Sequence, residues 1–161
     1  MIHLKLEVKK LTQKDAIDIL SWKYEKPYDF YNAMLTPDAM LELLGPSYYA
    51  VKNEQNQLVG FFCSGKAART EAGYAVDAYS EDCIDIGIGM KPELTGKGYG
   101  TAFFKLGIEF ISENHSSKPL RLTVAQFNKR AIRLYEKFGF VKEKEFQDEI
   151  ELITMKKESI Y

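Results

Sequence analysis

The sequence is poor in the residues that mark metal-binding and disulfide-rich proteins. Its 161 residues include two cysteines, Cys63 and Cys83, and two histidines. Each cysteine lies in its own apolar run, with no CxxC motif and no Cys/His spacing. We therefore expect two reduced, packed thiols and no metal site.

An excess of charge of one sign is also missing. Lys and Arg number 22 against 23 Asp and Glu, which gives a net charge of -1. Without a positive field the chain has little means of holding a polyanion, so we expect no nucleic-acid and no membrane partner. The longest apolar runs, such as residues 58–63, are too short to span a bilayer, and the first residues do not resemble a signal peptide. We predict a cytoplasmic protein.

What is present is the composition of an ordinary globular domain. Hydrophobic residues make up 45% of the chain and charged residues 28%, a balance typical of soluble proteins. A chain of this length forms one domain with a sizeable core more readily than two domains. No repeat, linker or low-complexity segment divides it. We predict a single domain over residues 1–161.

Apolar periodicity indicates strands and helices in a mixed order. Thr12 with Asp15 predicts a helix start that resembles a capping box, and Thr36 before Pro37 predicts a second helix start. Residues 64–82 have weak periodicity and are predicted to form a mobile loop. Two further helices are expected to end near Asn114 and at Gly139, and strands are expected at residues 2–9, 48–52, 58–63, 83–90, 120–125, 140–146 and 150–155.

The most informative segment is a glycine loop, residues 96–100, between a predicted strand and a predicted helix. Glycines at alternate positions remove side chains, so successive backbone N–H groups can converge on an anion at a helix N-terminus, where Lys97 adds a cation. The pattern is not that of a P-loop, and no acidic residue ends a strand about 20 residues later, as a dinucleotide fold requires. From the spacing alone, a pyrophosphate site and a flexible connection are equally good interpretations.

Two motifs in order make the signal specific. Pro92-x-x-x-Gly96-Lys97-Gly98-Tyr99-Gly100 follows a strand, and Asn128-x-x-Ala131-x-x-Leu134-Tyr135-Glu136-Lys137-Phe138-Gly139-Phe140 follows later. Together they resemble the GNAT superfamily of acyl-CoA-dependent N-acyltransferases, from roughly Tyr48 to the C-terminus. The family prefers Gln or Arg before the first glycine, where this chain has Thr95.

The resemblance implies an α/β fold with a mixed α+β sheet. The sheet would be twisted and mostly antiparallel, flanked by about four helices, and splayed between its fourth and fifth strands, residues 83–90 and 120–125. Acetyl-CoA would lie in that split, with its pantetheine arm paired to backbone groups and its pyrophosphate at the glycine loop. The implied cofactor contacts are Ile88, Gly89, Met90, Thr95, Gly96, Lys97, Gly98, Tyr99, Gly100, Thr101, Asn128 and Tyr135.

The implied reaction transfers an acetyl group from acetyl-CoA to a primary amine by direct attack in a ternary complex. Tyr135 is the implied general acid, because its hydroxyl would donate to the departing thiolate. The amine must lose a proton, and Asp85, on the open face of its strand, is the first candidate for the base. The family's glutamate base would fall on Ile84, so stabilisation of a neighbouring loop is the alternative role of Asp85. Other candidate bases are Glu81, Asp82 and Glu25.

An aromatic segment around Pro27 lies where GNAT proteins build the acceptor side of the site. Its rings and carboxylates suit an amine, and the implied substrate contacts are Tyr24, Glu25, Tyr28 and Tyr31. Anchoring the first helix to the sheet explains the same aromatics equally well. The acceptor is a small-molecule or peptide amine, with polyamine, amino sugar, amino acid and protein N-terminus all open, and the protein is a monomer or homodimer.

Three other functions stay open. A non-catalytic acyl-CoA sensor is favoured by the unmatched base position. Thiol-based acyl transfer is weakened because neither cysteine has a motif-linked histidine. A generic phosphate-binding module for another nucleotide remains if the glycine loop is no more than an anion nest.

Overall fold

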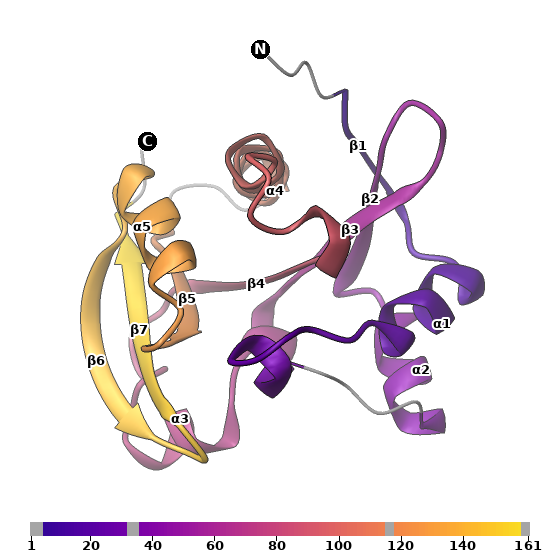
Figure 1. The fold of residues 1–161 in the computed structure, drawn as a ribbon. Helices are drawn as coiled ribbons and strands as arrows, with labels where there is room; N and C mark the ends of the chain where they lie inside the picture. The colour runs from indigo at the N-terminus through magenta and orange to yellow at the C-terminus, as the bar shows by residue number, and fades with distance from the viewer. Residues whose placement is uncertain (1–4, 32–35, 115–117, 159–161) are drawn as a thin grey trace. The chain divides into compact units, whose positions relative to one another are not determined.

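The computed structural model describes residues 5–31, 36–114 and 118–158. Within these ranges seven strands form one sheet in the order β1-β2-β3-β4-β5-β7-β6 (Figure 1). The β4–β5 pair is parallel, whereas the β1–β2, β2–β3, β5–β7 and β6–β7 pairs are antiparallel, which confirms the predicted mixed sheet. The strands are β1 (Glu7–Lys10), β2 (Tyr48–Lys52), β3 (Leu58–Ser64), β4 (Ile84–Met90), β5 (Leu120–Ala125), β6 (Val141–Gln147) and β7 (Glu151–Lys157).

Five α-helices accompany these strands in the described part of the chain: α1 (Gln13–Ser21), α2 (Pro37–Leu43), α3 (Glu71–Ala75), α4 (Gly100–Asn114) and α5 (Lys129–Lys137). Short 3₁₀ turns, η1 (Tyr28–Tyr31), η2 (Gly65–Ala68) and η3 (Pro92–Leu94), link some of them. The first predicted strand, residues 2–9, begins outside the described residues, and β1 overlaps its last three positions and extends to Lys10.

The chain divides into two compact units. One contains residues 1–63 and 88–110, and the other contains residues 64–87 and 111–161. Strand β4 and helix α4 contribute residues to both. The expectation of a single domain stays a prediction.

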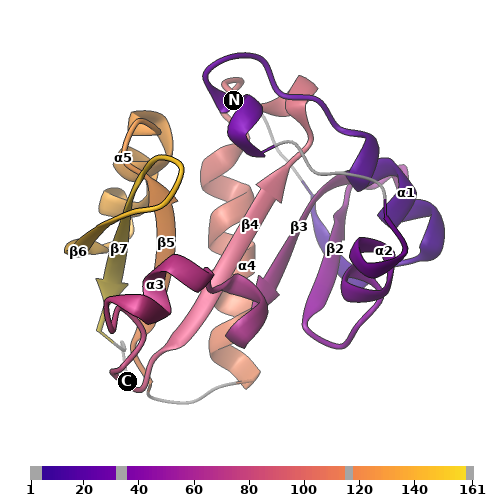
Figure 2. The same cartoon turned by 90° about the horizontal axis from the view of Figure 1, so that it is seen from below.

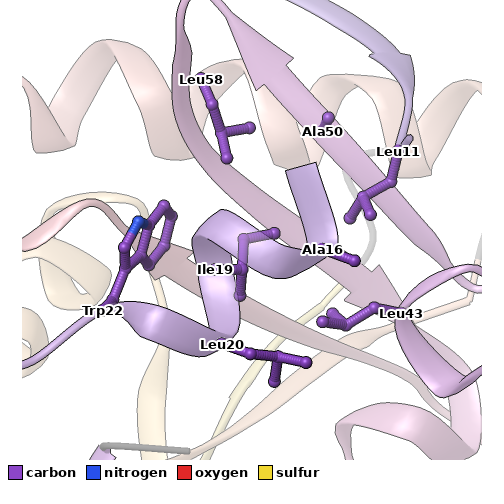
Figure 3. Packing of buried hydrophobic residues seen from close by; sticks show 8 residues of the cluster. All are labelled: Leu11, Ala16, Ile19, Leu20, Trp22, Leu43, Ala50 and Leu58. Atoms are coloured by element: carbon purple, nitrogen blue, oxygen red, sulfur yellow. The ribbon is translucent and has the colours of Figure 1, made fainter. Parts of the chain in front are cut away.

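In the first unit, local capping chemistry starts both helices as predicted. The Thr12 hydroxyl accepts a hydrogen bond from the Asp15 N–H at 3.1 Å, and the Asp15 carboxylate accepts one from the Thr12 N–H at 3.0 Å, which completes a capping box for α1. The Thr36 hydroxyl accepts from the Ala39 N–H at the start of α2. Figure 3 shows the apolar core beneath these helices: Leu11, Ala16, Ile19, Leu20, Trp22, Leu43, Ala50 and Leu58.

One ion pair is buried beside this core. The Lys52 ammonium lies 3.2 Å from the Asp15 carboxylate, and their side chains are 10% and 8% exposed. Burial alone raises the pKa of Asp15, but the hydrogen bonds with Thr12 and the charge of Lys52 outweigh it, so the pKa is lowered below its usual value. The helix cap and the ion pair thus depend on the same ionised carboxylate.

In the second unit, β5 pairs with β7 over six positions, and β7 pairs with the edge strand β6. Figure 1 shows these three strands side by side. The pairing of β4 with β5 covers two positions, Ile84 with Leu120 and Asp85 with Arg121. The parallel part of the sheet is therefore anchored at the beginnings of both strands.

The predicted loop at residues 64–82 was wrong in one respect, because it contains η2 and α3 (Figure 2). Thr70 caps α3 by accepting from the Gly73 N–H at 3.2 Å. A Cβ at Gly73 would lie 2.5 Å from the Tyr79 ring, so the helix packs tightly on that tyrosine. Five residues are too few to show helical periodicity, and tertiary packing supplies what the local pattern lacks.

Candidate active site

The glycine loop connects β4 to α4 through η3. The Thr95 hydroxyl donates to the Pro92 carbonyl oxygen at 2.8 Å, so the threonine that departs from the family pattern closes the turn. Gly96 and Gly98 have φ angles of +72° and +84°, in the left-handed region that glycine adopts without a steric penalty. The backbone of this loop therefore requires glycine at two positions.

The backbone N–H groups of the loop are available to a ligand. Within the described part of the chain, those of residues 96–100 donate to no acceptor, and helical bonding starts with the Phe103 N–H on the Tyr99 carbonyl oxygen. A Cβ at Gly98 would meet nothing within 4 Å, and Lys97 is exposed. Unpaired donors, open space and the N-terminus of a 15-residue helix fit a pyrophosphate group.

The end of β4 carries the next predicted cofactor contacts, Ile88, Gly89 and Met90, all of them half-buried. The Tyr24 hydroxyl donates to the Met90 carbonyl oxygen at 2.6 Å. The structure thus places a predicted substrate residue directly against a predicted cofactor residue.

Gly89 has a packing reason to be glycine. A Cβ there would lie 2.3 Å from the Phe61 ring. On the neighbouring strand, a Cβ at Gly60 would lie 2.5 Å from the Gly89 carbonyl oxygen and 2.6 Å from the Phe103 ring. The missing side chain at Gly89 makes room for the Phe61 ring.

The other predicted acceptor residues lie on the segment that leads into η1. The Tyr28 N–H donates to the Glu25 carbonyl oxygen at 2.7 Å, and the Glu25 side chain is exposed. Tyr31 ends η1, and its side chain is outside the described part of the structure. Among these four residues, Tyr24 hydrogen-bonds a candidate cofactor residue, Met90.

Asp85 lies at the centre of a buried cluster, here called the Asp85 cluster: Asp85, Arg69, Arg121 and Tyr79. Arg121 donates from Nε to Oδ1 and from Nη2 to Oδ2 of Asp85, both at 2.8 Å, and both side chains are 1% exposed. Arg69 Nε donates to Oδ2 at 2.7 Å. The guanidinium carbons of Arg69 and Arg121 lie 5.5 and 5.1 Å from the centre of the Tyr79 ring.

Electrostatics keep both arginines charged. The hydrogen bond with Tyr74, and then the hydrogen bond and charge interaction with Asp85, raise the pKa of Arg69 against the opposing effect of burial. Burial lowers the pKa of Arg121, but its hydrogen bonds and charge interaction with Asp85 outweigh burial and raise it overall. Both guanidinium groups of the cluster therefore stay protonated.

These contacts bear on the choice of base. Both Asp85 oxygens accept charge-assisted hydrogen bonds, so a proton taken up there would break at least one of them. The surroundings favour the alternative role, fixing the neighbouring 64–82 segment, and the base assignment stays a prediction. Glu81 and Asp82 are exposed and pair with Lys156 and Lys118.

The second motif forms α5. The Asn128 side-chain oxygen accepts from the Ala131 N–H at 3.2 Å, so Asn128 caps this helix. Tyr135 is 7% exposed, and its ring centre lies 6.3 Å from that of Phe140. Contacts of Asn128 and Tyr135 with a cofactor stay predictions.

Sequence reasoning missed Arg69, Arg121 and Tyr79. A signal for one of them was present: Asp85 and Arg121 occupy two strands expected to be neighbours, with opposite charges in otherwise apolar runs. Arg69 and Tyr79 lie in the segment that was predicted to be a loop, where no sequence pattern marked them as site residues.

The described residues can be searched for a metal site and a membrane-spanning helix, and they include both cysteines. No group of three or more His, Cys, Asp or Glu side chains there could hold a metal ion, and no helix in those ranges has the length and apolarity to span a bilayer. In the described part of the chain, Cys63 and Cys83 are buried and form no disulfide, and burial raises the pKa of the Cys83 thiol. The prediction of packed thiols is confirmed.

Comparison with known proteins places these features in a family. The model of the Acetyltransferase (GNAT) family matches residues 14–140. A curated relative, the mycothiol acetyltransferase of Acidimicrobium ferrooxidans, is 28% identical over 96 residues, which cover 60% of this chain. The chain spans about 28% of the length of that relative.

Solved structures share the fold. An aminoglycoside acetyltransferase in complex with coenzyme A has a TM-score of 0.73 at 18% identity, over 96% of this chain and 95% of its own. A GNAT-family acetyltransferase from Bacillus anthracis has a TM-score of 0.71 at 16% identity, over 98% and 97%. A spermidine N-acetyltransferase chimera from Vibrio cholerae and hSSAT has a TM-score of 0.69 at 19% identity, over 95% of both chains. Since the family model covers most of the sequence, including both motifs, the chain belongs to the GNAT acetyltransferase family.

Proposed function

We propose that this protein transfers an acetyl group from acetyl-CoA to a primary amine. The observation that carries the proposal is the glycine loop, whose N–H groups at residues 96–100 are unpaired among the described residues and precede α4. Oriented amides at a helix N-terminus recognise a pyrophosphate. Two solved structures with the same fold support the proposal: an aminoglycoside acetyltransferase in complex with coenzyme A and a spermidine N-acetyltransferase chimera.

Acetyl-CoA, when bound, supplies an acetyl group activated as a thioester. The residues of this chain supply the rest: the glycine loop binds the pyrophosphate, and backbone groups of residues 88–90 hold the pantetheine arm. Tyr135 donates the proton of its hydroxyl to the sulfur atom as that atom gains negative charge. The amine nitrogen releases one proton to solvent, and the Tyr135 tyrosinate regains one proton from solvent, so the proton exchange balances.

The amine must attack in its neutral form. Because guanidinium groups already occupy both Asp85 oxygens, we assign Asp85 to the alternative role of fixing its neighbours. The attacking nitrogen then releases its proton to water, and turnover rises with pH as more amine is neutral.

Two glycines provide a matched test of the cofactor site. Gly98 and Gly65 have φ angles of +84° and +79°, and a Cβ at either would meet nothing within 4 Å. An alanine at either position costs roughly 1–2 kcal/mol of folding stability through backbone strain alone. Only the Gly98→Ala methyl group enters the space proposed for the pyrophosphate.

Calorimetry with acetyl-CoA should show a large loss of affinity for Gly98→Ala and wild-type affinity for Gly65→Ala. Equal affinities in the two variants would remove the glycine loop from the binding site. Tight binding by ATP but not by CoA would support a generic nucleotide module. Binding of acetyl-CoA without turnover of any amine in a broad panel would support the sensor function, which the paired state of Asp85 favours.

A further inference from the structure

The positive charge of Arg69 is not required to neutralise the Asp85 carboxylate. Arg121 alone donates to both Asp85 oxygens at 2.8 Å, in the bidentate geometry that suits a carboxylate. Within the described part of the chain, Asp85 is the one carboxylate within ion-pair distance of either arginine. Two guanidinium groups and one carboxylate leave a net charge of +1 in the cluster.

Arg69 also has hydrogen-bond donors to spare. Of its five N–H groups, the one on Nε donates to Asp85, and one on Nη1 reaches the Tyr74 hydroxyl at 3.4 Å. Nη2 has no acceptor among the described residues, and no buried side-chain nitrogen or oxygen there lacks a partner, so Nη2 is open to solvent. The Arg69 side chain is 19% exposed, against 1% for Arg121.

The guanidinium of Arg69 is held in place before any ligand arrives. Its carbon lies 5.5 Å from the Tyr79 ring centre and 6.0 Å from that of Tyr74. The Tyr79 hydroxyl accepts from the Thr70 N–H at 3.0 Å and shares a hydrogen bond with the Thr123 hydroxyl at 2.9 Å, which fixes the ring. A ligand that binds this group therefore pays little ordering entropy.

We propose that Arg69, together with the Tyr74 hydroxyl, binds a carboxylate group, and that the acceptor amine of the reaction carries this group. The planar fork of a guanidinium matches a carboxylate, and one negative charge balances the surplus of +1. Tyr74 is 46% exposed, and its hydroxyl accepts from Arg69, so its proton is free to bond a ligand oxygen. The acceptor class is an amino acid, and this second half of the inference rests on the proposed function.

The decisive experiment compares each amino acid with its amide as acetyl acceptor, because the two differ by one carboxylate. The wild-type ratio of kcat/KM, acid over amide, should be about 10 to 100 for the best acceptor, the value of a charge-assisted hydrogen bond. Arg69→Gln should bring this ratio close to one, and Arg69→Lys should restore part of it. A wild-type ratio near one, or an unchanged ratio in Arg69→Gln, overturns the proposal.

Lys66→Gln is the matched control, because it removes an exposed positive charge from η2 of the same segment without removing a fork of donors. The acid-to-amide ratio of Lys66→Gln should equal that of the wild type. If the ratio falls equally in Lys66→Gln and Arg69→Gln, the effect comes from general positive charge and the proposal is wrong. Arg69→Gln should remain folded in a thermal melt, since Asp85 keeps both hydrogen bonds from Arg121.

A binding measurement separates this inference from the proposed function. Titration with acetate at constant ionic strength should shift the Arg69 side-chain NMR signals saturably, and chloride should not. Saturable acetate binding without acetylation of any amine would leave the carboxylate site standing and reject the transferase. Acetylation of amines that lack a carboxylate, with no acetate binding, would leave the transferase standing and reject the site.

Discussion

Replacing Asp85 by asparagine tests whether this carboxylate holds the structure together or takes a proton. The substitution keeps the shape of the side chain and removes its charge, which leaves the buried Arg121 guanidinium without an ionic partner. Removing one member of a buried ion pair costs about 3–5 kcal/mol. In a protein of this size each kcal/mol lowers Tm by about 2–4 °C, so the expected fall is roughly 6–20 °C.

The control is Asp82→Asn, three residues away in sequence. Asp82 pairs with Lys118 at 3.2 Å, but its side chain is 79% exposed, and such surface pairs contribute about 0–1 kcal/mol. Thermal unfolding followed by circular dichroism should therefore separate the two variants clearly. Urea unfolding should likewise show a larger loss in the free energy of unfolding for Asp85→Asn than for Asp82→Asn.

The reasoning fails if Asp85→Asn keeps the wild-type Tm. If, in addition, that variant loses most turnover at low pH and recovers it at high pH, where more amine is neutral, Asp85 is the base after all. A destabilised variant whose pH–rate profile keeps the wild-type shape would confirm the structural role.

Two further predictions concern other carboxyl and hydroxyl groups. Tyr135→Phe keeps the buried ring and should lower the free energy of unfolding by about 1 kcal/mol. Its kcat should fall on the order of 10²-fold while its affinity for acetyl-CoA stays unchanged. Steady-state kinetics and calorimetry measure the two effects, and a loss of affinity alone would make Tyr135 a binding residue. The lowered pKa of Asp15 means that its stabilising effect is present above the ordinary value of 3.8 and is lost as pH falls through the folded-state pKa. Asp15→Asn should therefore lower the free energy of unfolding, measured with urea at neutral pH, by about 1–3 kcal/mol. The decline of this free energy in acid should also be flatter, and an identical acid decline would refute the prediction.

Features encoded by neighbouring residues could be predicted from the sequence. The caps at Thr12, Thr36 and Asn128 and the helix stop at Gly139 depend on groups within a few positions, and all are present. The positive φ angles of Gly96 and Gly98 likewise agree with a turn that needs glycine. Such signals are local, so a single sequence contains them in full.

Long-range partners could not be predicted in the same way. Asp85 was placed on an open face because strand alternation was the only guide, whereas Arg69 and Arg121, 16 and 36 residues away, enclose it. Alternation says which residues share a face of a strand and leaves open what covers that face. The glycine at position 89 shows the same limit, because its neighbour Phe61 lies on another strand.

The close packing around Gly89 has a consequence for mutational libraries. A side chain at this position meets the Phe61 ring at 2.3 Å, so a single-substitution scan would score position 89 as intolerant even in an assay that reports abundance alone. The same scan read only through activity would count Gly89 among the residues that contact the cofactor. In a pairwise library that also shortens position 61, small residues at position 89 would be recovered, and their activity would then report on the cofactor alone.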